Sequence, residues 1–286
     1  MDDCVWTTLE GDHIVRTPMI PTLLLALALP VALALGCNSQ DSTQPSVSGA
    51  GGLDPAQATA PELTPPADIA TLAVSEPPLP PFNPNNFVQK VDNLLFPLPL
   101  GRRLVYRGTE DGLPEVVITD ITRLHKTILG VPITVVLDRV FLDGRLKEKT
   151  FDWYAEDKNG NVWYFGEDTK EFDENGKVIS TAGSFEAGKN GAKAGVIMRS
   201  HLVRGQVTPQ EFAPGVAEDK ARVVDLHATV TVPFGTFHEC LKTEEFTALE
   251  PDVLENKFYC PRYGIVRERD ARGGTVSTAL VNVIQK

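Results

Sequence analysis

Apolar and polar residues alternate along most of the chain after residue 100, with the period of two that a half-buried β-strand shows. Val, Ile, Thr and aromatic residues predominate in these stretches, and no strong amphipathic helix pattern appears among them. Strands are predicted at Arg103–Arg107, Glu115–Arg123, Ile133–Phe141, Leu146–Glu156, Val162–Glu167, Val223–Val232, Phe237–Thr247, Asn256–Cys260, Ile265–Arg269 and Thr275–Ile284. The pattern therefore predicts a mainly β domain.

Turn sequences such as Asp111-Gly112 and Asp143-Gly144 separate the early strands. Asp accepts local backbone hydrogen bonds, and Gly adopts positive φ without strain. The turn glycines recur every 14 to 18 residues from Gly112 to Gly176, which predicts long antiparallel strands in a meander. Such strands favour a highly curved sheet or an open barrel. Residues 182–222 are rich in glycine and weakly periodic, so we expect a long excursion over the sheet.

An uncharged apolar run extends from Ile20 to Gly36. It has about the length of a signal-peptide core and is marginal for a membrane-spanning helix. The run ends in Leu33-Ala34-Leu35-Gly36-Cys37, which resembles the lipobox of bacterial lipoproteins, with Ala34 where that family usually has Leu. The resemblance implies that residues 1–36 are a signal peptide and that Cys37 carries lipid (palmitate) as the new N-terminus. An uncleaved single-span anchor is the alternative, and Met1 and Met19 are both candidate start positions.

The next segment, residues 37–86, begins with Cys37 and has the composition of a disordered linker. Residues 38–86 hold ten of the 22 prolines and five carboxylates, with no Lys or Arg. Such a segment cannot bury enough apolar surface to fold, so we expect a tether with polyproline character. A single β-rich domain is expected over 87–286, where 26 basic and 29 acidic side chains nearly balance. The absence of a basic stripe argues against nucleic acid as a partner.

The segment from Asp152 to Asp168 concentrates the residues best suited to a functional site. Alternation places Asp152, Tyr154 and Glu156 on one face of a strand, with Trp153 and Ala155 on the other. Candidate acid and base groups of a hydrolase are Asp152, Glu156, Glu167 and Asp168; candidate ligand-stacking rings are Trp153, Tyr154, Trp163 and Tyr164. The structural alternative is a hairpin with an aromatic core and a charged rim.

The cysteines and histidines allow two further predictions. Cys240 and Cys260 lie on successive predicted strands, which favours a disulfide, with two free buried thiols as the alternative. His227 and His238 flank one predicted hairpin and are weak candidates for a metal site. No complete calcium-loop, phosphate-loop or dinucleotide-binding motif is present, so no cofactor is expected.

Three segments together resemble a widespread family of uncharacterised exported bacterial proteins: Asp152-Trp-Tyr through Phe165-Gly-Glu-Asp, Thr231-Val-Pro-Phe-Gly-Thr-Phe237, and Phe258-Tyr-Cys-Pro-Arg-Tyr-Gly-Ile-Val266. That family usually has Ala where this chain has Cys260, and it carries no established activity. We therefore expect a cell-envelope lipoprotein at the outer membrane or cell surface, whose β domain is a non-catalytic ligand-binding or envelope-interaction module. Its partners are expected to be the membrane, through Cys37, and a small molecule, a glycan or an envelope component. The alternative is an extracytoplasmic hydrolase that uses the paired carboxylates of residues 152–168.

Overall fold

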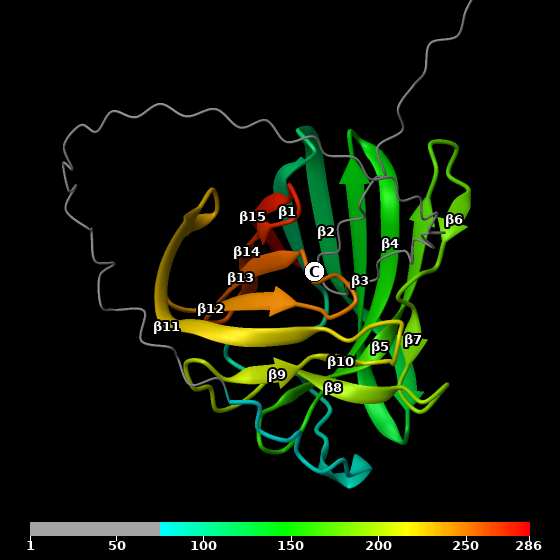
Figure 1. The fold of residues 1–286 in the computed structure, drawn as a ribbon, viewed down its shortest axis with the longest axis vertical. Coiled ribbons are helices and arrows are strands. Elements are labelled where there is room, and N and C mark those ends of the chain that lie inside the picture. Colours follow the sequence, from blue (N-terminus) through cyan, green and yellow to red (C-terminus); the bar gives the residue numbers. More distant parts are fainter. Residues whose placement is uncertain (1–74) are drawn as a thin grey trace, which may run out of the picture.

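A computed structural model describes residues 75–286 (Figure 1). These residues form one turn of 3-10 helix, η1 (Pro84–Asn86), and fifteen strands in a single sheet. The strands are β1 (Arg102–Glu110), β2 (Leu113–Ile128), β3 (Val131–Leu142), β4 (Arg145–Glu156), β5 (Val162–Phe172), β6 (Val178–Ser180), β7 (Phe185–Glu186), β8 (Lys193–Met198), β9 (Val207–Pro209), β10 (Glu211–Phe212), β11 (Lys220–Val232), β12 (Gly235–Phe246), β13 (Leu254–Cys260), β14 (Gly264–Arg272) and β15 (Ser277–Gln285). The expected mainly β fold is confirmed.

The sheet consists of two antiparallel meanders joined in the middle. Strands β1 to β5 pair in sequence order, as do β11 to β15, and β1 pairs with β15 to connect the two halves. Two-residue turns link β1 to β2 and β3 to β4, with Asp111 and Asp143 at positive φ before Gly112 and Gly144. This is the hairpin geometry that the Asp-Gly sequences predict.

The sheet is so strongly curved that its two edges are neighbours in the chain. Its strand order starts with β10 and ends with β9, and only Gln210 separates these two strands. In Figure 1, β9 and β10 follow one another across the space between β11 and β5. The excursion expected over 182–222 is therefore wrong in part, because this region supplies β7, β8, β9 and β10 to the sheet.

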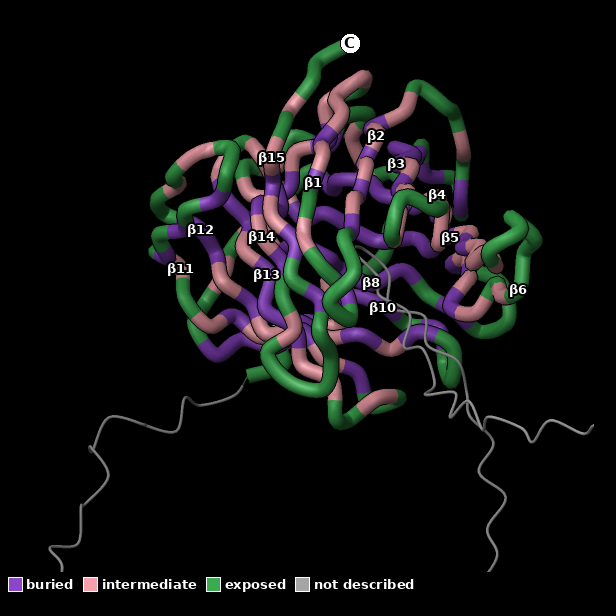
Figure 2. The backbone as a smooth tube through the Cα atoms, turned by 90° about the horizontal axis from the view of Figure 1, so that it is seen from above, coloured by how far each residue is buried: buried purple, intermediate pink, exposed green. Residues whose placement is uncertain are grey.

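Both faces of the β3–β5 region are buried. The inner face of the curve holds the main apolar core, and a second cluster that includes Trp153 and Trp163 lies on the outer face. Figure 2 shows buried positions alternating with more exposed ones along the strands. Residues before the predicted domain boundary at Phe87 cover the outer cluster: the Phe82 ring lies 6.2 Å from that of Trp163. Contacts with the sheet extend back to Ser75, which bridges to Gln206.

The predicted signal peptide, the lipidated Cys37 and most of the predicted linker lie outside the described residues. Within residues 75–286, no helix has the length and apolar character needed to cross a membrane.

Candidate functional site

Carboxylic side chains line much of the inside of the curved sheet. The buried members are Glu110, Glu115, Asp138, Glu148, Asp152, Glu167, Glu211, Asp219, Glu245, Glu255 and Glu268. Lys257 is the one Lys or Arg that is fully buried among residues 75–286. Buried carboxylates normally need a cation or hydrogen-bond donors, because desolvation strongly disfavours an isolated charge. Most of these groups therefore require protons or polar partners.

Two of the predicted acid and base residues meet on one tyrosine. The hydroxyl oxygen of Tyr164 lies 2.7 Å from Asp152 Oδ1 and 2.8 Å from Glu167 Oε2, and all three side chains are buried. A hydroxyl has one proton and can donate to one of these carboxyls. The other carboxyl must itself be protonated and donate to the tyrosine oxygen. The arrangement thus holds at least one proton between the two acids.

A β-bulge brings Glu167 to this position. Phe165 and Gly166 on β5 together oppose the single residue Trp153 on β4, so the register shifts by one residue between Tyr164 and Glu167. Both of these side chains then face the inside. Gly166 has φ 116° and lies so close to β7 that an added Cβ would be 2.1 Å from the Phe185 carbonyl oxygen. Only glycine fits this backbone position.

Burial raises the pKa of each acid in this cluster. It raises the pKa of Glu167 to about 8 and that of Asp138 to about 7, and it raises the pKa of Asp152 well above its ordinary value. After burial, negative charge on Asp138 and then on Glu167 further raises the pKa of Asp152. Neighbouring buried carboxyls cannot all ionise cheaply, so this cluster retains protons.

A hydrogen-bonded row formed by two threonines and Glu148 lies beside this cluster. The Thr150 hydroxyl donates to Glu148 Oε1 at 2.9 Å and lies 3.0 Å from the Thr169 hydroxyl. Burial, followed by the nearby charge of Glu167, raises the pKa of Glu148 well above its usual range. The row therefore spans β4 and β5 on the inner face.

On the opposite half of the sheet, Lys257 offsets three carboxylates. Its Nζ lies 3.1 Å from Glu245, 3.4 Å from Glu255 and 4.0 Å from Glu268. Burial alone would lower the pKa of Lys257, but attraction to these three acids outweighs burial and raises it. One cation cannot offset the charge of three buried acids. Burial raises the pKa of Glu255 to about 8, although Lys257 acts to lower it.

The other two predicted acids have structural roles and do not join Asp152 and Glu167. Glu156 accepts the backbone N–H groups of Asp92 at 2.7 Å and Asn93 at 2.8 Å, which fixes the segment before β1. Asp168 is half exposed and pairs with Lys170 at 2.9 Å. The four predicted acids therefore do not converge on one site.

The four predicted stacking rings are all buried, and they divide between the two faces of the sheet. Tyr154 and Tyr164 stack inside the curve with ring centroids 4.9 Å apart. Trp153 and Trp163 lie in the outer cluster, where Lys126 Nζ sits 3.7 Å from a Trp153 ring centroid. These rings form core contacts and present no stacking surface to solvent.

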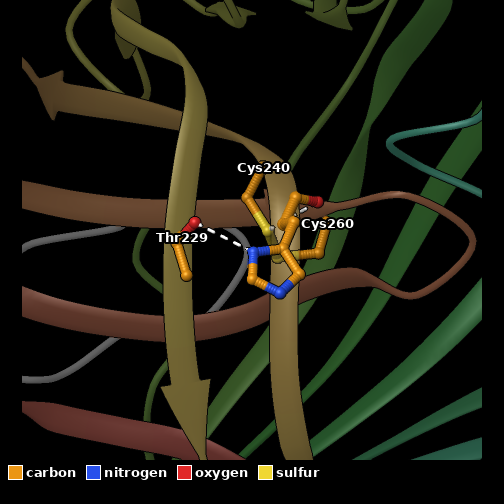
Figure 3. The surroundings of a disulfide bond; sticks show 4 residues. Thr229, Cys240 and Cys260 are labelled. Atoms are coloured by element: carbon orange, nitrogen blue, oxygen red, sulfur yellow. Dashed lines mark hydrogen bonds between the residues drawn. A yellow bond between two sulfur atoms is a disulfide. The ribbon is translucent and has the colours of Figure 1, made fainter.

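Cys240 and Cys260 form the predicted disulfide between β12 and β13, with Cα atoms 4.3 Å apart (Figure 3). The histidines of the neighbouring hairpin do not meet. His227 pairs with Glu239, and His238 Nδ1 lies 3.1 Å from the Thr229 hydroxyl. Within residues 75–286, no group of three or more His, Cys, Asp or Glu side chains has an arrangement that could hold a metal ion.

Two cavities of ligand size open at the surface. The first, which we call the β9–β12 hollow, has a volume of about 750 Å³ and is lined by Phe212, Phe246, Leu254, Lys220, Arg222 and Arg272, among others. The second, which we call the Arg102 pocket, has a volume of about 560 Å³ and includes Lys90, Leu94, Leu98, Leu100, Arg102 and Arg262. Neither is lined by Asp152 or Glu167. Sequence reasoning missed both, because their lining residues come from loops and strand ends far apart in the chain.

The comparisons with known proteins found partial structural likenesses. No family model and no curated protein matches the sequence. A Bacteroides fragilis protein, described as exported and as having a YmcC-like fold, is 13% identical with a TM-score of 0.41; the match covers 68% of this chain and 100% of that one. A Parabacteroides distasonis protein, described as a lipoprotein, is 12% identical with a TM-score of 0.37; the match covers 67% of this chain and 99% of that one.

Proposed function

We propose that this protein is an exported, lipid-anchored cell-envelope protein whose β domain binds a ligand without catalysing a reaction. The lipobox-like segment ending at Cys37 supports export and anchoring. The Cys240–Cys260 disulfide supports an oxidising compartment, because such bonds persist mainly outside the cytosol.

The burial of Asp152 and Glu167 away from solvent is the observation that most directly supports the non-catalytic assignment. Hydrolysis needs an acid and a base within reach of substrate and water. Here Asp152 is 0% exposed and Glu167 2% exposed, and both are engaged by Tyr164. The ligand-sized cavities lie elsewhere, which favours binding over hydrolysis.

Two measurements test the proposal. Cells fed a radiolabelled or alkyne-tagged fatty acid should label the wild-type protein, and Cys37→Ala should abolish the label and release the protein from the membrane fraction. Purified wild type and the Asp152→Asn/Glu167→Gln variant should show equal background rates on chromogenic glycoside and ester substrates. A wild-type rate that this variant loses would instead establish the hydrolase.

A further inference from the structure

We propose that the Arg102 pocket binds an amphiphilic anion: a molecule with a phosphate or carboxylate head and an apolar tail. The inference rests on the proposed binding function and names its site and ligand class. Three features of the pocket support it: a preformed apolar wall, cations that form no ion pair, and exposed leucines at the rim.

The wall is formed by the segment that precedes β1. Leu98 N–H donates to the Val91 carbonyl at 2.9 Å, which closes residues 91–98 into a loop. The Asn93 side chain donates to the Gly160 carbonyl and accepts the N–H of Leu95, so the loop is tied to the sheet and to itself. Because the apolar wall is already ordered, ligand binding has a smaller conformational-entropy cost.

The cations of the pocket lack carboxylate partners. Among residues 75–286, no ion pair joins Lys90, Arg102 or Arg262 to an acid. Arg102 donates from Nη1 to the Arg262 backbone carbonyl at 2.8 Å, which draws the two guanidinium-bearing residues together across the pocket. Burial lowers the pKa of Arg102, as expected for a cation partly removed from water without an acid beside it. An anionic head would supply the missing partner.

The β9–β12 hollow provides the internal comparison. There Lys220 pairs with Glu76 at 2.9 Å, Arg222 pairs with Glu244, and Arg272 donates to the Asp252 carbonyl at 3.2 Å. Lys220 and Arg222 of that hollow already have carboxylate partners, so an anionic ligand would have to compete for them. Among the residues that the structure describes, Asp92 is the one acid that lines the Arg102 pocket, and it forms no ion pair with Lys90, Arg102 or Arg262, so these cations remain available to an anionic head.

Exposed apolar side chains extend from the pocket. Leu94 is 58% exposed and Leu100 47% exposed, and both line the cavity. Pro97 and Leu98 also line a smaller cavity of about 30 Å³ that reaches Tyr106 and other inner residues. Apolar surface beside unpartnered cations matches the two ends of an amphiphile, whereas free inorganic phosphate would leave the leucines uncovered.

Calorimetric titration of the mature chain, residues 37–286 with Cys37→Ala to prevent acylation, tests this site. Residues 75–286 form one sheet with its own core, so this chain is expected to fold without the signal peptide. The anionic probe is dodecyl phosphate below its micellar concentration. Inorganic phosphate supplies the head alone, and dodecyl maltoside supplies the tail with a neutral head. Phosphatidylglycerol vesicles, with phosphatidylcholine vesicles as their control, distinguish a membrane lipid from a free amphiphile.

The account predicts saturable binding of dodecyl phosphate and at least about tenfold weaker binding of either control compound. Arg102→Gln/Arg262→Gln should weaken dodecyl phosphate binding at least about tenfold, while Arg107→Gln, an exposed arginine farther along β1, should leave it unchanged. Leu94→Asp/Leu100→Asp alters exposed positions that do not hold the core, and it should also reduce affinity. Binding to phosphatidylglycerol vesicles in addition assigns a membrane lipid, and its absence assigns a free amphiphile; both outcomes support the site.

Equal binding of dodecyl maltoside, or full affinity in the folded Arg102→Gln/Arg262→Gln variant, would overturn the inference. Binding to vesicles without binding to monomeric dodecyl phosphate would also overturn it, because the pocket would then have no role. Any of these three results leaves the exported, non-catalytic assignment standing, since fatty-acid labelling at Cys37 and the substrate assays test that assignment independently.

Discussion

The Tyr164 hydroxyl lies 2.8 Å from Glu167 Oε2, and the two residues reach each other because a β-bulge turns both side chains to the inner face of β5. Asp152 lies 2.7 Å from the same hydroxyl. The pair of acids is therefore part of a closed core that retains protons. A hydrolase would instead need an acid–base pair that is open to substrate and water.

Removing the shared hydroxyl should destabilise the fold. Tyr164→Phe leaves the Asp152 and Glu167 carboxyls without their common partner, and we expect a loss of about 1–3 kcal/mol in the free energy of unfolding. Urea denaturation measures it. Tyr263→Phe, at a half-buried ring outside the acidic cluster, is the matched control and should change stability by less than about 0.5 kcal/mol. Equal effects of the two substitutions would mean that the hydroxyl has no special role.

The bulge itself should depend on glycine at position 166. Gly166→Ala combines positive φ with a Cβ placed 2.1 Å from the Phe185 carbonyl oxygen. Gly176→Ala also has positive φ, at 76°, but its Cβ would meet nothing within 4 Å. We expect Gly176→Ala to cost about 1 kcal/mol and Gly166→Ala at least 2 kcal/mol more, measured by urea denaturation. Similar costs would show that β7 moves away without penalty.

Stability should fall as pH rises from about 4 to about 8. The folded-state pKa values of Asp138 and Asp219 are about 7, and those of Glu167 and Glu255 about 8, all above the ordinary values near 4. The folded protein then binds more protons than the unfolded chain in this interval. Each such proton lowers the free energy of unfolding by about 1.4 kcal/mol per pH unit. Below the pKa values that these acids have in the unfolded chain, near 4, their full contribution to the free energy of unfolding is present. Above about pH 8 this contribution is lost.

Urea denaturation at intervals across this range measures that slope. Asp120 and Glu186 act in the opposite direction, because bonds to Arg103 and to Lys126 lower their pKa values despite the effect of burial. Their contribution is lost as pH falls below about 4, so the maximum stability is expected near pH 4–5. Stability that increases steadily from pH 5 to pH 8 would contradict the buried-proton account.

The disulfide should stabilise the β12–β13 pair. Cys240→Ala/Cys260→Ala opens a loop with a sequence separation of 20 residues, and we expect a loss of about 3 kcal/mol. Adding reductant to the wild type should give a similar loss, while the double variant should be insensitive to reductant. Thermal unfolding with and without reductant separates these cases. If reductant leaves the wild-type transition unchanged, the bond does not contribute to stability.

The sequence predicted the meander well because its turns are local: Asp111-Gly112 and Asp143-Gly144 each determine a hairpin within a few residues. It also predicted the Cys240–Cys260 pair, since both cysteines belong to neighbouring strands. The β-bulge at Gly166 and the strong curvature depend on contacts between distant strands, which alternation does not encode. For the same reason the site prediction selected Asp152 and Glu167 but could not reveal that both are sealed inside.

Infrared absorption of the carboxyl carbonyl stretch gives the most direct test that Asp152 and Glu167 form a proton-retaining core. At about pH 7 exposed Asp and Glu side chains are ionised, so a protonated-carboxyl band must come from buried acids. We predict such a band in the folded protein, and a weaker band in the Asp152→Asn/Glu167→Gln variant. A folded wild-type protein without this band at pH 7 would contradict the account.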